Sequence, residues 1–347
     1  MAMRPYRPWE DMMIADLIRK VADGKDLTAE EAHAAMTEIM EGQASPVQIA
    51  SFLTAMRMKG ETVEEITEFA RVMREHVVKV NAQRRPLVDT CGTGGDALKT
   101  FNVSTAAAFV AAGAGVAVAK HGNRSVTSKC GSADVLEALG VKVQQTPEEV
   151  ARCIDEIGIG FMFAPAFHPA MKHAAPVRRE LGMRTVFNML GPLTNPAGAE
   201  AQVLGVYSSE LTEVHAGVLQ RLGCSRALVV HGEGGLDELS TIGQTRVTEV
   251  RDGKTSTYAV TPEDLGLKRA SLEQIAGGTV EENARLLGDV LAGKAGPARD
   301  IVLLNAGAAI VAGGRAGDLR SGVQAAARAI DSGAALDKLE AMRSFLS

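Results

Sequence analysis

A glycine-rich segment near residue 92 is the first part of this sequence that could do chemistry. The residues CGTGGD (91–96) follow a short apolar run, and NVST (102–105) leads into an Ala-rich stretch. Closely spaced glycines let backbone N–H groups approach an anion, and the start of a helix adds unpaired donors and the positive end of its dipole. The pattern predicts a phosphate-binding loop between a strand and a helix, with an ordinary tight turn as the alternative.

Two familiar phosphate loops can be compared with this segment. A Walker A loop needs a glycine directly before Lys-Ser/Thr, whereas Leu98 stands at that position, which disfavours a P-loop nucleotidase. Gly92, Gly94 and Ala97 satisfy the dinucleotide pattern GxGxxG/A, but that pattern also requires an acidic residue at the end of the next strand. The next apolar run ends in Lys120, which suits a phosphate better than a ribose. A nicotinamide dehydrogenase is therefore only a second candidate.

A second polar segment, KHGNRSVTSK (120–129), combines cations, hydroxyls and one glycine directly after that apolar run. The carboxyl ends of parallel strands lie at one edge of a sheet, where open α/β folds bind ligands. We therefore expect this segment to surround a polyphosphate together with the glycine-rich loop, with a solvated loop as the alternative. Ser132 opens the amphipathic stretch that follows, and we expect it to be the N-cap of that helix and to touch phosphate.

A third segment, GGLDELS (234–240), places two adjacent carboxylates among glycines. Mg²⁺ takes oxygen ligands and is usually held by one or two carboxylates plus substrate phosphates. Asp237 and Glu238 meet that description, and Ser104 could add a hydroxyl oxygen from the first loop. An exposed acidic turn is the alternative.

Covalent acyl chemistry has no support, because the sequence contains neither a GxSxG element nor a Ser-His-Asp spacing. A reaction in which a polyphosphate leaves needs less from the protein, because Mg²⁺ and cations can neutralise the charge that builds up on the leaving phosphates. We therefore assign no acid or base, and expect electrostatic roles for Lys120, Asp237 and Glu238.

These loops need a scaffold, and the apolar pattern predicts two parts of it. Between residue 12 and about residue 80, the apolar residues recur at helical spacing. Three helix starts in this range have capping-box spacing: Thr28 with Glu31, Ser45 with Gln48 and Thr62 with Glu65. Short apolar runs then alternate with helical stretches, which predicts a mostly parallel sheet flanked by helices. The expected strands are 87–90, 116–120, 159–164, 201–207 and 227–232. We expect a small helical domain over 1–82 and an α/β domain over 83–347. We also expect the helical segment 165–189 to pack on the small helical domain.

Composition favours an ordinary α/β enzyme that acts on small molecules. Hydrophobic residues make up 46% of the chain and aromatic residues 4%, which favours closely packed helices and sheet–helix layers over a β-sandwich. The net charge of −5 disfavours nucleic-acid and membrane partners. The sequence has no signal-peptide core, no apolar run of membrane-spanning length and no CxxC pairing, so we expect a cytoplasmic protein whose cysteines are thiols. These cysteines are Cys91, Cys130, Cys153 and Cys224.

Five separated motifs resemble anthranilate phosphoribosyltransferases, in the order and with the separations typical of that family. They are DTCGTGGD (89–96), NVST (102–105), KHGNRSVTSKCGSADVLEALG (120–140), VRRELGMRTVFNMLGPLTNP (177–196) and GLDELS (235–240). The resemblance covers essentially the whole chain. It implies the nucleoside phosphorylase/phosphoribosyltransferase type of fold, a homodimer, and an active site in the hinge region between a helical and an α/β domain.

The resemblance also implies an activity. Members of this family transfer the 5-phosphoribosyl group from 5-phosphoribosyl 1-diphosphate to the amine of anthranilate, a step of tryptophan biosynthesis, and use Mg²⁺. Two classes of related fold remain as alternatives: pyrimidine nucleoside phosphorylases, which use free phosphate without Mg²⁺, and homologues that bind nucleic acid. The pair of Asp237 and Glu238 disfavours the first class, and Arg178 with the negative net charge disfavours the second.

Carried onto this sequence residue by residue, the resemblance implies three sets of site residues. The diphosphate sugar would contact Gly92, Gly95, Asp96, Thr100, Asn102, Val103, Ser104, Thr105, Lys120, His121, Gly122, Asn123, Arg124, Ser125, Val126, Thr127, Ser128 and Ser132. The Mg²⁺ ions would be held by Ser104, Asp237 and Glu238. Anthranilate would contact Gly92, Asn123 and Arg178, with His168 and the Gly191-Pro192 turn along its approach. The planar guanidinium of Arg178 suits the acceptor carboxylate.

Overall fold

The computed structural model describes residues 13–94, 100–125 and 130–345 of the chain. Its contacts divide the chain into two compact units. A helical unit comprises Met1–Val78 and His168–Thr194, and an α/β unit comprises Lys79–Phe167 and Asn195–Ser347. Each unit is therefore assembled from two separate stretches of sequence.

The helical unit is built from capped helices packed in pairs. Its main helices are α1 (Ile14–Ala22), α2 (Ala29–Met40), α3 (Pro46–Lys59), α4 (Val63–Glu75), α9 (Ala175–Leu181) and α10 (Phe187–Leu190). The three predicted capping boxes are confirmed; in the first, Glu31 N–H donates to Thr28 Oγ1 at 3.3 Å, and the Glu31 carboxylate accepts the Thr28 N–H at 2.8 Å. Helix α1 packs against α3, α2 against α4, and α9 and α10 against α3 and α4. Buried Phe52 and Phe69 meet edge to face within this unit.

The α/β unit contains a seven-stranded sheet in the order β3-β2-β1-β4-β5-β6-β7. Its strands are β1 (Leu87–Gly92), β2 (Ala117–Gly122), β3 (Ile159–Phe163), β4 (Ala201–Gly205), β5 (Arg226–Gly232), β6 (Thr245–Arg251) and β7 (Lys254–Val260). Strands β1 to β5 pair in parallel, so the predicted mostly parallel sheet is confirmed. Strands β6 and β7 add an antiparallel hairpin that the sequence analysis did not predict. Its turn, Asp252-Gly253, has positive φ at both residues, as a type I′ turn requires.

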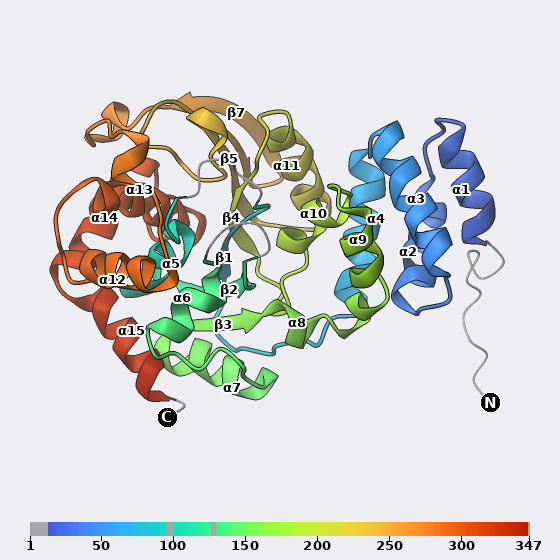
Figure 1. Ribbon diagram of the computed structural model, residues 1–347. Helices are drawn as coiled ribbons and strands as arrows, with labels where there is room; N and C mark the ends of the chain where they lie inside the picture. The colour runs from blue at the N-terminus through green and yellow to red at the C-terminus, as the bar shows by residue number, and fades with distance from the viewer. Residues whose placement is uncertain (1–12, 95–99, 126–129, 346–347) are drawn as a thin grey trace. The chain divides into compact units, whose positions relative to one another are not determined.

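Helices cover both sides of this sheet (Figure 1). Figure 1 shows α5 (Val103–Gly113) and α12 to α15 (Val280–Leu291, Pro297–Ala312, Leu319–Asp331 and Ala334–Phe345) on one side, and α11 (Leu211–Arg221) on the other. Shorter helices α6 (Ser132–Ala138), α7 (Pro147–Arg152) and α8 (Ala164–Phe167) complete the unit. Helices α13 and α14 approach so closely at Gly307 that an added Cβ would lie 2.7 Å from the Val323 nitrogen. Such close packing explains why this core uses Ala and Gly where other cores use aromatic residues.

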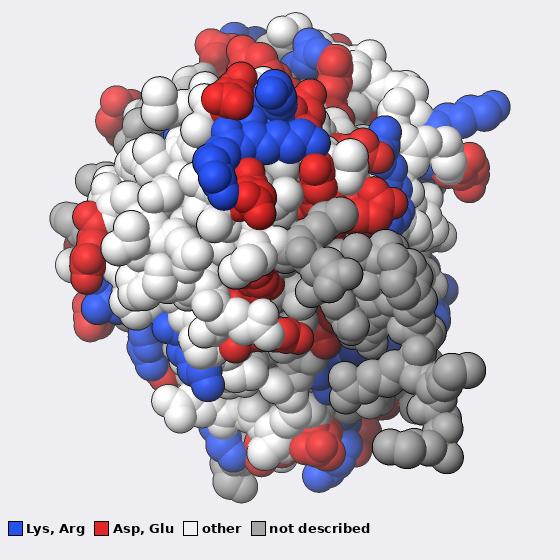
Figure 2. Space-filling model, turned by 90° about the vertical axis from the view of Figure 1, so that its right-hand side faces the viewer, with Lys and Arg blue, Asp and Glu red and all other residues white. Residues whose placement is uncertain are grey.

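The surface carries charges of both signs. On the face shown in Figure 2, Lys and Arg side chains lie beside Asp and Glu side chains. In the helical unit, Lys20 pairs with Glu31 at 2.5 Å in a partly exposed position, whereas Lys59 pairs with Glu65 at 2.9 Å in the interior. None of the described helices combines the length and the apolar character needed to cross a bilayer.

Candidate active site

Hydrogen bonds join the three predicted loops of the α/β unit, as expected where parallel strands end at one edge. Gly94, just beyond β1, donates its N–H to the Asp237 carboxylate at 2.9 Å. Lys120, on β2, donates to the Thr90 carbonyl at 2.5 Å and to Ser104 Oγ at 3.3 Å. The structure thus brings the glycine-rich loop, the cationic segment and the acidic segment together.

Two glycines allow the acidic segment to approach this closely. A Cβ on Gly92 would lie 2.2 Å from Asp237 Oδ2, and a Cβ on Gly205 would lie 1.5 Å from the Asp237 carbonyl oxygen. Both distances are far shorter than any real Cβ contact, so a side chain at either position would displace Asp237. The need for glycine here arises from space and not from backbone conformation, because neither residue has a positive φ.

Lys120 and Asp89 are buried residues of opposite charge, 3% and 0% exposed. Burial lowers the pKa of Lys120, and the charges of Asp89 and Glu238 oppose that shift. Burial raises the pKa of Asp89, and Lys120 and Asn195 oppose that shift in turn. Asp89 Oδ2 accepts from Asn195 Nδ2 at 2.7 Å, and Oδ1 accepts the His121 N–H at 3.1 Å. The Lys120 ammonium is therefore held by two oxygen acceptors and supported by one buried carboxylate.

Ser104 and Glu238 line one small cavity, together with Thr90, Cys91 and Asn305. The Glu238 carboxylate and the Ser104 hydroxyl thus bring hard oxygen donors to this cavity, and Asp237 is the next residue in the chain. Among the residues with described positions, no group of three or more His, Cys, Asp and Glu side chains could hold a metal. The donor set fits Mg²⁺ that completes its shell with water and substrate phosphate oxygens.

Asn102 stands directly before α5 and ties two further segments to this edge. Its Nδ2 donates to the Cys130 carbonyl at 3.2 Å, and its Oδ1 accepts from Asn283 Nδ2 at 3.3 Å. Asn283 in turn accepts the Gly278 N–H at 2.8 Å. The start of α5 is thereby fixed to the segments that begin α6 and α12.

The prediction that Ser132 is the N-cap of the next helix is wrong. Gly131 is the N-cap of α6, and the Asp134 carboxylate accepts the Gly131 N–H at 2.9 Å. Ser132 Oγ instead accepts the Asn123 N–H and donates to the Asn123 carbonyl, both at 3.2 Å. The side chain of Ser132 therefore holds the second loop, because the carboxylate of Asp134 already serves the helix start.

Arg124 directs its charge toward α6. Its guanidinium lies 2.9 Å from Asp134 and 2.6 Å from Glu137, and these carboxylates raise its pKa. The Ser125 N–H donates to the same Asp134 at 3.1 Å. The second loop is thus tied to α6 by both side-chain and backbone contacts.

The other residues predicted for the diphosphate sugar fall into three groups. Thr100 forms an isolated antiparallel β-bridge with Ala276. Val103, Thr105 and His121 are buried, whereas Gly122 is half-buried and a Cβ there would lie 2.3 Å from Ser132 Oγ. Five predicted residues lie outside the described residues: Gly95, Asp96, Val126, Thr127 and Ser128.

Four of the residues predicted for the acceptor side lie in the helical unit: His168, Arg178, Gly191 and Pro192. Arg178, on α9, is half-buried with its guanidinium carbon 5.2 Å from the centre of the Phe187 ring, and burial lowers its pKa. The next residue, Arg179, is exposed. His168 is buried, and this burial lowers its pKa to about 4, so it is neutral near pH 7. Gly191 and Pro192 form a single 3₁₀ turn with Leu193.

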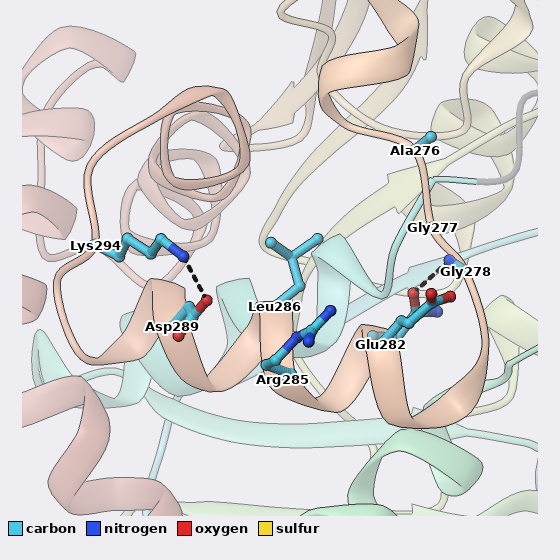
Figure 3. A pocket seen from close by; sticks show the side chains of 9 residues that line it. Ala276, Gly277, Gly278, Glu282, Arg285, Leu286, Asp289 and Lys294 are labelled. Carbon is cyan, nitrogen blue, oxygen red and sulfur yellow. Dashed lines mark hydrogen bonds and ion pairs between the residues drawn. The ribbon is translucent and has the colours of Figure 1, made fainter.

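A larger cavity of about 510 Å³ lies at the start of α12 (Figure 3). Gly277 in its wall lies so close to the preceding loop that a Cβ would be 2.8 Å from the Thr100 carbonyl oxygen. Figure 3 shows Lys294 paired with Asp289, at 2.9 Å, within this cavity. None of the described residues that line it was singled out from the sequence.

Three buried polar residues beside the predicted site were not among those predicted from the sequence. Asp89 stands in an apolar strand, Asn195 ends the GPLTN turn, and Asn305 interrupts the apolar face of α13. A charged or amide side chain within an otherwise apolar run was the available signal, because buried polar groups are normally hydrogen-bonded. Their partners are distant in sequence and could not be identified from it.

Comparison with known proteins adds independent information. Residues 15–77 match the family model described as "Glycosyl transferase family, helical bundle domain", and residues 84–336 match "Glycosyl transferase family, a/b domain". The chain is 62% identical to the anthranilate phosphoribosyltransferase of Symbiobacterium thermophilum, over 95% of this chain and 96% of that protein. It is 57% identical to that of Moorella thermoacetica, over 95% of this chain and 97% of that protein.

Solved structures agree with these matches. The crystal structure of anthranilate phosphoribosyltransferase from Thermus thermophilus superposes with a TM-score of 0.91 at 52% identity, covering 95% of this chain and 99% of that one. The anthranilate phosphoribosyltransferase from Saccharomyces cerevisiae in complex with PRPP and Mg superposes with a TM-score of 0.88 at 31% identity, covering 97% of this chain and 99% of that one.

Proposed function

The chain belongs to the anthranilate phosphoribosyltransferase family, and on that premise we propose that it uses Mg²⁺ to transfer the 5-phosphoribosyl group of 5-phosphoribosyl 1-diphosphate to the amine of anthranilate. The products are N-(5′-phosphoribosyl)anthranilate and diphosphate. One observation carries the proposal beyond the family match. Hydrogen bonds join a glycine-rich loop, a buried lysine and an acidic segment, which suits a Mg²⁺-bound diphosphate.

The chemistry divides between the leaving group and the acceptor. As the bond from the anomeric carbon to the diphosphate oxygen breaks, negative charge builds up on the diphosphate. Lys120 supplies a fixed cation for that charge, and Mg²⁺ held by Ser104, Asp237 and Glu238 would neutralise it further. The amine nitrogen forms the new bond to the anomeric carbon and releases its proton to water. We assign no general base, because anthranilate is already a neutral nucleophile.

A direct assay tests the proposal. Purified protein is mixed with anthranilate, phosphoribosyl diphosphate and Mg²⁺, and the fluorescence of anthranilate is followed over time. We expect loss of fluorescence that requires both the sugar and the metal. Folded protein that binds the sugar diphosphate but consumes no anthranilate would overturn the acceptor, and release of ribose phosphate from a pyrimidine nucleoside by inorganic phosphate would favour the phosphorylase class.

Arg178→Ala should weaken anthranilate binding selectively. We propose that the half-buried guanidinium of Arg178 pairs with the acceptor carboxylate, and losing such a charge-assisted contact costs about 1.5–3 kcal/mol. The KM for anthranilate should therefore rise about tenfold to a hundredfold, with a much smaller change in the KM for phosphoribosyl diphosphate. Both constants come from initial rates in the fluorescence assay.

The neighbouring arginine offers a matched control. Arg179 is exposed on the same helix, so Arg179→Ala removes an equal charge and should leave both KM values near those of the parent. Equal rises in both KM values for Arg178→Ala would assign that residue to folding and not to the acceptor.

Gly92→Ala should weaken the metal site. The added Cβ would lie 2.2 Å from Asp237 Oδ2, so this carboxylate must move. We expect the Mg²⁺ concentration for half-maximal rate to rise about tenfold or more, as for other changes that disturb a metal ligand. Gly288→Ala is the control, because a Cβ has open space at that position inside α12. A Gly92→Ala protein with an unchanged Mg²⁺ requirement would contradict the assignment of Asp237.

We also propose that the protein acts as a homodimer in the cytoplasm. The family resemblance supports the dimer, and all four cysteines, which lie in described parts of the chain, are thiols and not disulfides. Light scattering on the purified protein should give twice the mass of one chain.

A further inference from the structure

The side-chain amide of Asn305 makes an unusual set of contacts in the core of the α/β unit. Asn305 lies on α13 and is 2% exposed. Its Oδ1 accepts the Leu239 N–H at 2.9 Å, and its Nδ2 donates to the Leu239 carbonyl at 2.9 Å. Nδ2 also donates to the Ile301 carbonyl, one turn earlier in the same helix, at 2.9 Å. One amide therefore satisfies both backbone groups of a single residue in another segment.

That residue directly follows the two acidic residues. Leu239 is fully buried, so water cannot replace the amide as a partner for its backbone. Glu238 and Asn305 line the same small cavity as Ser104. The bonds to Leu239 thus fix the backbone at the point where the acidic segment enters the core.

The same segment is confined on its other sides by backbone. The Asp237 carbonyl would lie 1.5 Å from a Cβ on Gly205, and the Glu238 carbonyl would lie 2.6 Å from a Cβ on Gly232. These close approaches limit where the chain can go, and the Gly232 N–H also donates to the Leu236 carbonyl at 2.8 Å. Asn305 adds directional contacts on the other side of the acidic pair, at the peptide groups of Leu239 beside Glu238.

We propose that Asn305 is a positioning residue, which holds the Asp237-Glu238 segment in the geometry that binds Mg²⁺. This inference rests on the proposed function of those carboxylates. An amide suits the position because only a group with both a donor and an acceptor can pair with an N–H and a C=O at once. Asn305→Asp has the same shape, but a carboxylate cannot donate to the carbonyls of Leu239 and Ile301.

Metal binding measured apart from turnover tests the proposal. Mn²⁺ is titrated into protein with a fixed amount of phosphoribosyl diphosphate, and free Mn²⁺ is followed by its electron paramagnetic resonance signal, corrected with the sugar alone. For Asn305→Asp we expect Mn²⁺ affinity to fall about tenfold to a hundredfold, the range for outer partners of metal ligands. The Mg²⁺ concentration for half-maximal turnover should rise by a similar factor, while the KM for anthranilate stays near that of the parent.

Two further variants separate positioning from stability. Val311→Ala removes buried apolar volume from the same helix at a position where the side chain lies against Gly322 of α14, so it should lower the melting temperature and leave Mn²⁺ affinity unchanged. Asn305→Ser keeps one small donor and acceptor and is the milder replacement if Asn305→Asp does not fold; it should also weaken Mn²⁺ binding.

The outcomes distinguish this inference from the proposed function. Folded Asn305 variants that bind Mn²⁺ as the parent does, or a Val311→Ala protein with an equal loss of Mn²⁺ affinity, would overturn the role of Asn305. A parent protein that binds Mn²⁺ with the sugar diphosphate but consumes no anthranilate would overturn the proposed acceptor and leave the role of Asn305 standing.

Discussion

Replacing both Asp237 and Glu238 with alanine is expected to lower Mg²⁺-dependent turnover by about a hundredfold or more. The two carboxylates and Ser104 are the oxygen donors proposed for the metal, and electrostatic stabilisation of a developing charge is often worth factors of that size. The measurement is the rate of anthranilate consumption over a wide range of Mg²⁺ concentration. Saturating Mg²⁺ should restore little of the lost rate, because both protein ligands are absent.

A single isosteric change tests the charge of Asp237 alone. Asp237→Asn keeps an oxygen that can accept the Gly94 N–H, the contact seen at 2.9 Å, so it removes the charge and preserves the contact between loops. Asp252→Asn is the control, since Asp252 occupies an exposed turn with positive φ, where asparagine is well tolerated. Intact Mg²⁺-dependent turnover in the double alanine variant would refute the metal assignment.

The second large effect is expected at Lys120. In Lys120→Met the cation proposed to face the diphosphate is lost, and buried Asp89 loses the nearby positive charge that opposes the rise in its pKa. Breaking a buried charge pair in this way typically costs about 3–5 kcal/mol of stability. We expect a large fall in melting temperature and at least a hundredfold fall in turnover at a temperature where the variant is folded.

A double-mutant cycle separates the two effects. Asp89→Asn alone should also lower the melting temperature, whereas Lys120→Met combined with Asp89→Asn removes both charges and should recover much of the stability. Activity should not recover in the double variant, because the cation is still missing. Additive losses of stability would show that Asp89 and Lys120 are not coupled, and a fully active double variant would remove Lys120 from the mechanism.

Local chemistry made much of this molecule predictable. Capping boxes such as that of Thr28 and Glu31 involve residues three positions apart, so their formation depends on nearby sequence alone. Buried parallel strands appear as apolar runs, and their carboxyl ends identify where ligand-binding loops should gather. The residue types that suit phosphate and Mg²⁺ were recognisable for the same reason, since glycines, cations and paired carboxylates follow the ends of those strands.

Other features depended on contacts between residues far apart in the chain. Asp89 meets Asn195 across 106 positions, and Asn305 meets Leu239 across 66. Nothing in the neighbouring sequence specifies those partners, because they are chosen by the packing of whole helices and strands.

Tertiary contacts also decided between local alternatives that the sequence left equivalent. Ser132 and Asp134 could each serve the start of α6; the carboxylate took the helix N–H, and the hydroxyl holds Asn123. Gly92 was predicted to lie in a phosphate-binding loop and Gly205 within a strand, and the structure shows that both make room for Asp237. Sequence therefore determined which chemical groups are available and roughly where each element begins, and the three-dimensional packing determined which of those groups meet, because hydrogen bonds and close contacts require positions in space that distant segments fix together.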